Sequence, residues 1–270
     1  MPEQEGQITR PVTSGEGGAP KDPFLPSVTT LEIKDRAGDS YFVDYFAFPR
    51  DPIDARNNAE RMPSLEPTIA GVLEMARPTF PKYTEAGIAN IGNKLRTFEG
   101  FDVVWNAERT EVVAFHVFAF ADIEAAGEEA RVMYVGHAGT KPDYQNRGIT
   151  TQSRAAVYEM LKPDIVTGSS AQSAIYVANQ HIAEQTGYVM YPTEATTDPR
   201  IGELALKIKD AIPAIQNAEM DATRLVRTYP EPIPVPAKDH PVGDKINLGP
   251  NDHIFYMLVN PFLNAKVLAQ

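Results

Sequence analysis

The sequence predicts a mixed α/β fold, in which a mostly antiparallel central sheet is flanked by helices. Two pairs of apolar runs, each pair joined by a short polar turn, occupy residues 28–48 and 101–123 and are typical of β-hairpins. A segment with helical periodicity lies between the two hairpins in the chain. A strand–helix–strand–helix–strand order over residues 131–191 completes the pattern, and this combination implies a mixed sheet with helices against it.

Strands and helices alternate in the first half of the chain. The first two strands surround the polar turn 35–39. Pro78 and Pro81 are expected to end the first helix because proline has no N–H to donate, and Gly100 is expected to stop the second. The expected strands here are 28–34, 41–48, 101–105 and 111–123, and the expected helices are 65–76 and 84–98.

The second half begins with a third strong strand and then a polar loop. Pro163 is expected to end the helix after that loop, and Gly187 the next one. Six prolines within residues 228–250 predict a loop. The expected strands are 131–140, 165–166, 188–191 and 253–259, and the expected helices are 148–161, 178–185 and 200–215.

Composition divides the chain into three parts. Residues 1–27 are rich in Pro, Gly, Glu and Ser and predict a flexible leader. Residues 28–191 hold the strong strand and helix signals and form the expected main domain. Residues 192–270 have weaker signals, so they are interpreted as a C-terminal extension packed on the same domain.

Charge and cysteine content exclude several classes of function. The formal net charge is −11, which argues against broad nucleic-acid binding because that needs basic surfaces. Cysteine is absent, so disulfides and thiol chemistry are excluded and a cytoplasmic location is expected. No apolar run is long enough to span a bilayer, no secretory signal is recognisable, and the five histidines lack metal-ligand spacing. We therefore expect no membrane, nucleic-acid or metal partner.

The segment 140–150, Thr-Lys-Pro-Asp-Tyr-Gln-Asn-Arg-Gly-Ile-Thr, joins the third strong strand to the helix at 148–161. It carries Gly148, two side-chain amides and Arg147 where the helix begins. Backbone N–H groups at a helix start are unpaired and carry partial positive charge. The loop therefore predicts a site for a phosphate or diphosphate.

In this context the chain resembles the GNAT superfamily of acyl-CoA-dependent N-acyltransferases. The resemblance covers residues 53–191. The residues that match the family's motifs are Pro142, Tyr144, Gln145 and Gly148, together with Ala178-Asn179-Gln180 before Gly187-Tyr188. It implies a GNAT-like fold and an acyl-CoA, most simply acetyl-CoA, as co-substrate. The cofactor-binding residues that it implies are Ala138, Gly139, Thr140, Gln145, Asn146, Arg147, Gly148, Ile149, Thr150, Thr151 and Asn179.

The resemblance also implies where proton transfer would occur. The family's acidic base falls at Tyr134, and His137 lies on the same strand with a side chain suited to accept a proton near neutral pH. Strand alternation puts His137 on the opposite face from Tyr134 unless a bulge intervenes. The family's Tyr acid falls at Ala183, and Thr150 replaces a usual Gly or Ala. Asn179 is alternatively a helix cap, and His116, amid apolar neighbours, favours a core or cleft role.

These observations lead to one main functional prediction and two alternatives. The main one is an N-acyltransferase, most simply an N-acetyltransferase, that acts by direct attack of a small amine or amino-acid-like acceptor lying over residues 53–100. Such a protein could form a homodimer. One alternative is a catalytically degenerate GNAT-fold module with an acyl-CoA-binding or regulatory role. It is motivated by Thr150, Ala183 and Tyr134. The other is an acyltransferase with a long-chain or carrier-protein donor.

Overall fold

The computed structural model describes residues 27–48, 65–170, 172–193, 198–221, 223–226 and 252–270. Residues 1–26 of the expected leader, the start of the expected helical segment at residues 53–64 and the Pro-rich loop at 228–250 lie outside these ranges, whereas Ser27 is the first residue of a strand. The chain divides into two compact units. One comprises residues 1–118 with 137–160, and the other comprises 119–136 with 161–270. The expected division at residues 28–191 and 192–270 stays a prediction.

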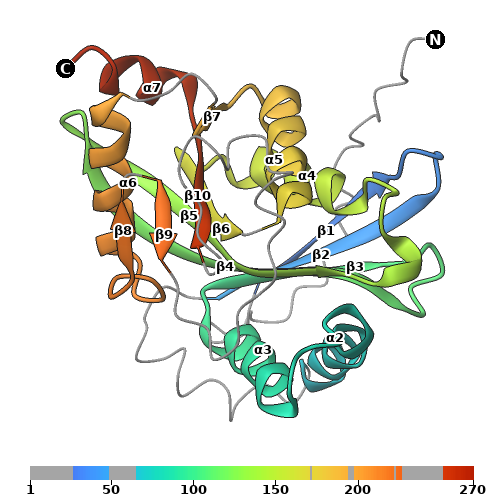
Figure 1. Cartoon of the computed structure of the whole chain (residues 1–270). Helices are drawn as coiled ribbons and strands as arrows, with labels where there is room; N and C mark the ends of the chain where they lie inside the picture. Colours follow the sequence, from blue (N-terminus) through green and yellow to red (C-terminus); the bar gives the residue numbers. More distant parts are fainter. Residues whose placement is uncertain (1–26, 49–64, 171, 194–197, 222, 227–251) are drawn as a thin grey trace. The chain divides into compact units, whose positions relative to one another are not determined.

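The first unit contains one antiparallel series of strands with helices on both faces. Strands β1 to β4 pair in chain order, and Tyr45, Asp102 and His116 lie opposite one another across β2, β3 and β4. Figure 1 shows α2 and α3 side by side on one face of these strands and α4 on the other. The elements are β1 Ser27–Lys34, β2 Ser40–Ala47, α2 Glu66–Thr79, α3 Glu85–Thr97, β3 Gly100–Trp105, β4 Val112–Ala125, η1 Pro142–Tyr144 and α4 Ile149–Leu161.

An aromatic and aliphatic core joins α2 and α3 to the strands of the first unit. Apolar residues recur at helical spacing on both helices, so each presents one apolar stripe to the sheet. Phe46 stacks on Phe101 with ring centroids 4.6 Å apart. The buried members are Phe46, Phe48, Leu65, Ile69, Val72, Met75, Ala76, Ile88, Ile91, Leu95, Phe101, Val103, Val112, Phe115 and Val117.

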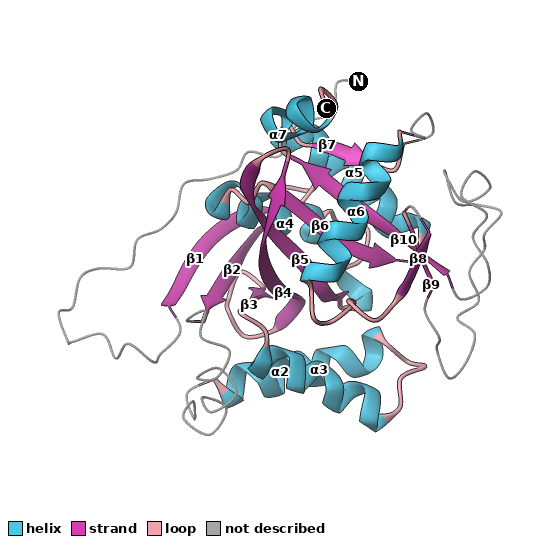
Figure 2. Cartoon of the chain, turned by 90° about the vertical axis from the view of Figure 1, so that its left-hand side faces the viewer, coloured by secondary structure: helices cyan, strands magenta, loops and turns pink. Residues whose placement is uncertain are grey.

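The second unit contains the parallel part of the sheet. β5 and β6 pair in parallel from Val132 to Val135, which makes the sheet mixed as expected. The strand order continues from β6 to β10, β9 and β8, and β7 pairs with β10. Figure 2 shows α6 in front of these strands and α5 behind them. The elements are β5 Glu128–Thr140, β6 Ile165–Ser170, α5 Ser173–Thr186, β7 Val189–Tyr191, α6 Pro199–Ala211, β8 Glu219–Asp221, β9 Arg224–Val226, β10 Asp252–Val259 and α7 Pro261–Val267.

Several boundaries differ from those predicted, each for a local reason. Pro78 lies inside α2, because a proline near the end of a helix removes only one late hydrogen bond. The expected loop at 124–130 is instead a tight turn with positive φ at Ala126 and Gly127, so β4 and β5 are longer than predicted. α5 begins at Ser173 rather than at 178, α6 ends at Ala211, and β8, β9 and α7 were not predicted.

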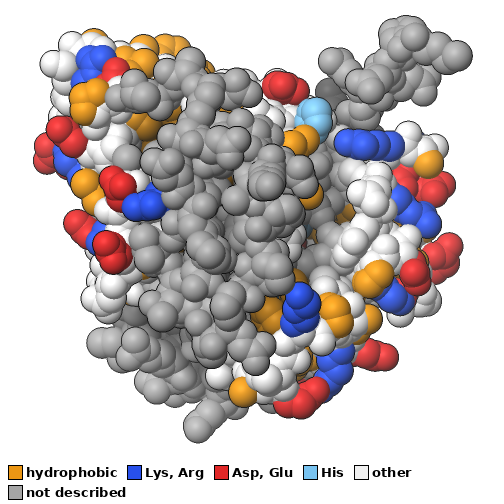
Figure 3. All heavy atoms as spheres, viewed as in Figure 1, with side chains coloured by type: hydrophobic (Ala, Val, Ile, Leu, Met, Phe, Trp, Pro, Cys, Tyr) orange, Lys and Arg blue, Asp and Glu red, His pale blue; other side chains and the backbone are white. Residues whose placement is uncertain are grey.

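Acidic and basic side chains of the described residues lie interspersed on the face that Figure 3 draws. Most arginines for which the structure gives a partner pair with a carboxylate at close range. Exposed pairs of this kind contribute about 0–1 kcal/mol each, so their main effect is local neutralisation. The pairs are Arg77–Glu85, Arg96–Glu66, Arg109–Asp44, Arg200–Asp198 and Arg224–Asp221.

Candidate functional site

The predicted phosphate loop lies between β5 and α4, within the first unit. β5 ends at Thr140, the 3-10 turn η1 follows, and α4 begins at Ile149. The first helical hydrogen bond runs from the N–H of Gln152 to the carbonyl of Gly148, at 2.9 Å. The N–H groups of the three residues before Gln152 therefore precede the helical ladder, as expected of a helix start. They form a cluster of donors that an anion can bind.

The turn into α4 needs left-handed backbone at two positions. Asn146 has φ 63° and Gly148 has φ 83°. Asparagine tolerates this region better than most residues, and glycine adopts it without steric cost. A methyl group placed on Gly148 would also lie 3.1 Å from Cγ of Arg36. Gly148 thus permits both the turn and the close approach of another chain segment.

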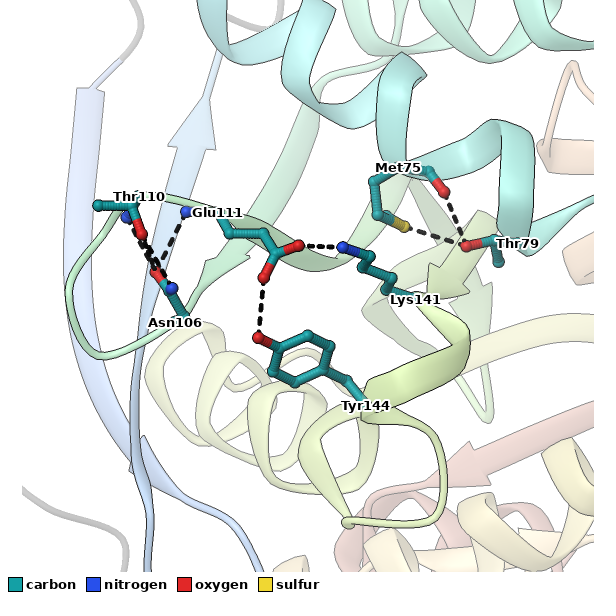
Figure 4. Close-up of polar contacts among 7 residues, drawn as sticks. All are labelled: Met75, Thr79, Asn106, Thr110, Glu111, Lys141 and Tyr144. Atoms are coloured by element: carbon teal, nitrogen blue, oxygen red, sulfur yellow. Dashed lines mark hydrogen bonds and ion pairs between the residues drawn. The ribbon is translucent and has the colours of Figure 1, made fainter.

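A carboxylate at the start of β4 holds the loop in place (Figure 4). Glu111 forms an ion pair with Lys141 and accepts a hydrogen bond from the Tyr144 hydroxyl at 2.8 Å. The Lys141 backbone N–H also donates to the Val113 carbonyl at 2.9 Å. The bond from Lys141 holds the pKa of Glu111 below its ordinary value, and the bond to Glu111 raises the pKa of Tyr144 to about 12. The Tyr144 phenol therefore stays neutral and keeps donating.

Three side chains expected to bind the cofactor take part in the loop's own structure. The Thr140 and Thr150 hydroxyls form a short hydrogen bond to each other. The Gln145 side-chain amide donates to the Thr140 carbonyl at 3.1 Å. Thr150, where a small residue is usual, is thus accommodated by a bond across the loop. The main donors left for an anion are backbone N–H groups.

The backbone N–H groups of the last residues of β5 point alternately to the two edges of the strand. Because the Lys141 N–H points to β4, strand alternation turns the Gly139 N–H toward β4 and the N–H groups of Ala138 and Thr140 toward the other edge. The Gly139 Cα faces the rings of Phe115 and Phe80, and a methyl group there would lie 2.9 Å from each ring. Gly139 is therefore required by packing, whereas Ala138 and Thr140 offer outward N–H groups.

His137 lies among aromatic rings on the α2–α3 side of β5. Its ring centroid is 5.2 Å from that of Phe80 and 6.0 Å from those of Tyr83 and Phe115. This is the side of the strand opposite to Thr140, as alternation predicts, and no bulge is needed to explain it. His137 is half-buried, and Tyr83 is 41% exposed. Three aromatic rings thus surround the imidazole, and its Nε2 atom is buried.

Tyr134 and Asn179 lie in the second unit, and both are buried. Tyr134 is opposite Thr167 in the parallel pairing with β6. Asn179 lies within α5, whose N-cap residue is Gln172, so the interpretation of Asn179 as a helix cap is wrong. Its amide donates to the Ile175 carbonyl at 2.8 Å, one helical turn back. Its Oδ1 is buried without a hydrogen-bond partner among the described residues. Ala183 is buried as well.

Arg36, Glu111 and the pair Asp102–His116 were not predicted as parts of a site. Arg36 donates its backbone N–H to the Arg147 carbonyl at 3.0 Å, and only folding brings these residues together. His116 Nδ1 lies 2.7 Å from Asp102 Oδ1, and both side chains have zero exposure, so the expected core role of His116 is confirmed. Within the described ranges, no group of His, Asp and Glu is arranged to hold a metal ion.

No protein-family model and no curated protein sequence matches the chain. Similar solved structures include a GCN5-related N-acetyltransferase from Kribbella flavida, at 18% identity and a TM-score of 0.33, over 42% of this chain and 30% of that one. The chain thus spans less than a third of that protein. A GNAT-family acetyltransferase from Bacillus anthracis is 13% identical, with a TM-score of 0.38, over 85% of this chain and 98% of that one.

A Bacillus subtilis acetyltransferase solved in complex with CoA is 11% identical, with a TM-score of 0.36, over 69% of this chain and 91% of that one. The Kribbella flavida and Bacillus anthracis proteins bear the name of the family that the sequence resembles. Since their identities and TM-scores are low, these similarities assign neither an activity nor a substrate to this chain. None of the described helices is both long and apolar enough to cross a membrane.

Proposed function

We propose that the chain is an acyl-CoA-dependent N-acyltransferase that transfers an acyl group, most simply acetyl, to a small amine or amino-acid-like acceptor. The observation that carries the proposal is the start of α4. There, the N–H groups of Ile149, Thr150 and Thr151 precede the first helical hydrogen bond, and the exposed Arg147 comes two residues before the helix. The diphosphate of CoA is an anion that such a helix start can bind.

In this proposal the acyl-CoA supplies the acyl group as a thioester, and the acceptor amine attacks it directly. The backbone N–H groups of Ala138 and Thr140, which point away from β4, are suited to bind carbonyl oxygens of the cofactor arm or the developing oxyanion. The loop, held by Glu111, fixes the cofactor relative to β5. Much of the rate gain would come from this alignment of the two reactants.

The acceptor would lie against the α2–α3 turn, where Phe80 and Tyr83 surround His137. His137 would accept the proton of the acceptor ammonium, since imidazole is the common general base near neutral pH. Tyr134 is the weaker candidate for this role, because its side chain is buried in the second unit. In line with the absence of cysteine, the proposal places the protein in the cytoplasm.

Calorimetric titration of acetyl-CoA and longer acyl-CoAs tests the proposal. Binding of at least one of them is expected, and the chain length that binds best would name the donor. The absence of binding at millimolar concentration for every one would refute it. Gly148→Ala should weaken this binding. Gly127→Ala is its matched control, because both glycines have positive φ but only Gly148 lies in the loop.

A catalytically degenerate module remains the second candidate, because Ala183 stands buried where a Tyr acid would be expected. The two candidates differ in whether the protein transfers the acyl group to an amine: the acyltransferase should, and the module should not. A panel of aryl, alkyl and amino-acid amines incubated with acetyl-CoA should show acyl transfer above the uncatalysed rate. Cofactor binding without transfer to any of these amines would favour the module instead.

A further inference from the structure

Arg36 lies at the tip of the β1–β2 turn and rests against the loop before α4. Its backbone N–H donates to the Arg147 carbonyl at 3.0 Å. Its side chain passes over Gly148, so that Cγ and Nε would lie 3.1 and 3.3 Å from a methyl group placed there. The turn itself is fixed by Asp35, whose Oδ1 accepts from the N–H groups of Ala37 and Asp39 at 2.9 and 3.0 Å. The position of Arg36 is therefore set by two independent sets of contacts.

The guanidinium of Arg36 has no carboxylate partner within the described residues. The nearby Asp35 carboxylate is buried, and its second oxygen accepts from the Tyr41 hydroxyl at 3.2 Å. Arg147 is exposed, lies over the Tyr144 ring at 5.1 Å, and donates to the Tyr41 hydroxyl at 3.5 Å. Five other arginines are paired with Asp or Glu. Arg36 and Arg147 thus lie next to each other through a backbone hydrogen bond, and neither forms an ion pair with a carboxylate of the described residues, although the net charge of the chain is −11.

We propose that Arg36, together with Arg147, binds a phosphate group of the cofactor and makes the site selective for the nucleotide-bearing coenzyme over a bare phosphopantetheine arm. Guanidinium groups form charge-assisted, often bidentate, hydrogen bonds with phosphates. The inference rests on the proposed function, but it adds a residue from a distant hairpin that the loop pattern does not contain. The inference also predicts that the acyl donor is not a phosphopantetheine arm attached to a carrier protein.

The test compares the affinities of CoA, dephospho-CoA and 4′-phosphopantetheine for the wild type, Arg36→Ala and Arg36→Lys. Wild type should bind CoA more tightly than 4′-phosphopantetheine, and Arg36→Ala should lose about tenfold in CoA affinity, the size of one charge-assisted hydrogen bond. Arg36→Lys should lose less. If Arg36→Ala weakens CoA but not dephospho-CoA, Arg36 binds the 3′-phosphate. If both weaken equally, it binds the diphosphate.

Lys34→Ala is the matched control, because Lys34 is an exposed cation on the same hairpin. It removes the same charge and should leave all three affinities unchanged. Equal affinities of Arg36→Ala and wild type for every compound would overturn the inference and leave the proposed function standing. If the proposed function itself is wrong, the wild-type protein should bind no CoA at all, and this result differs from the one that would overturn the role of Arg36. Both Arg36 variants retain the backbone N–H that bonds Arg147, and a thermal melt confirms that they fold.

Discussion

Gly148 illustrates how one residue can serve both local geometry and a neighbouring segment. Its φ of 83° lies in the left-handed region, and the Arg36 side chain lies directly above it. Gly148→Ala should destabilise the protein by about 1–2 kcal/mol through backbone strain. It should also weaken CoA binding about tenfold, because the N–H groups of α4 would move. Calorimetry and a chemical denaturation curve measure the two effects.

Gly127→Ala separates strain from binding in that experiment. Gly127 has φ 79° and no atom within 4 Å of a placed methyl group, at the β4–β5 turn. It should lose similar stability while keeping its CoA affinity. Equal loss of CoA affinity in both variants would mean that the loop geometry is not what binds the cofactor.

The buried pair of Asp102 and His116 shows the cost of polar groups in a core. Both side chains have zero exposure, and Asp102 Oδ2 and His116 Nε2 have no hydrogen-bond partner among the described residues. His116→Phe would leave the carboxylate without its partner and should lower the free energy of unfolding by about 3–5 kcal/mol. The double variant Asp102→Val/His116→Phe should recover most of that loss.

A double-mutant cycle by urea denaturation measures the coupling between these two residues. The exposed pair Arg77–Glu85 supplies the comparison, with an expected coupling below about 1 kcal/mol. Additive effects of the two core substitutions would contradict the interpretation of Asp102 and His116 as one buried unit.

At the scale of elements, the loop between β5 and α4 depends on the start of β4. Glu111 receives hydrogen bonds from Lys141 and Tyr144, and its pKa is lowered from the ordinary 4.5. A lowered carboxyl pKa stabilises the fold above the unfolded value, and this contribution is lost as pH falls through the folded value. Glu111→Gln should therefore cost about 1 kcal/mol at pH 7, since a partly exposed pair is screened by solvent.

The difference in melting temperature between wild type and Glu111→Gln should be full at pH 7 and should shrink as the pH drops below about 4.5. Glu108→Gln, which removes one exposed carboxylate from the same β3–β4 turn, should show no such pH dependence. A constant difference across the pH range would rule out the ionised Glu111 carboxylate as the anchor of the loop.

At the scale of the whole molecule, a ligand that binds only the folded state stabilises it by mass action. CoA at 100 times its dissociation constant should raise the free energy of unfolding by about 2.7 kcal/mol. A thermal shift that grows with CoA concentration is expected, whereas adenosine, which has no phosphate, should give none at the same concentration. The absence of any shift at saturating CoA would contradict cofactor binding.

The net charge also has a consequence at this scale. A chain of charge −11 repels an anionic cofactor at long range, so the attraction must come from local positive groups. Arg36, Arg147 and the start of α4 supply them within one unit.

The sequence by itself determined the order β5–loop–α4, because the apolar run, Pro142, Gly148 and the helical periodicity are all local signals that lie close together in the chain. It also determined the mixed sheet, and it favoured a core or cleft role for His116, which the structure places in the core. It could not predict the partners of the loop. Glu111 and Tyr144 are separated by 33 residues, and Arg36 comes from the first hairpin. Only tertiary packing decides such contacts, since nothing in the local pattern of one segment specifies which distant side chain lies against it.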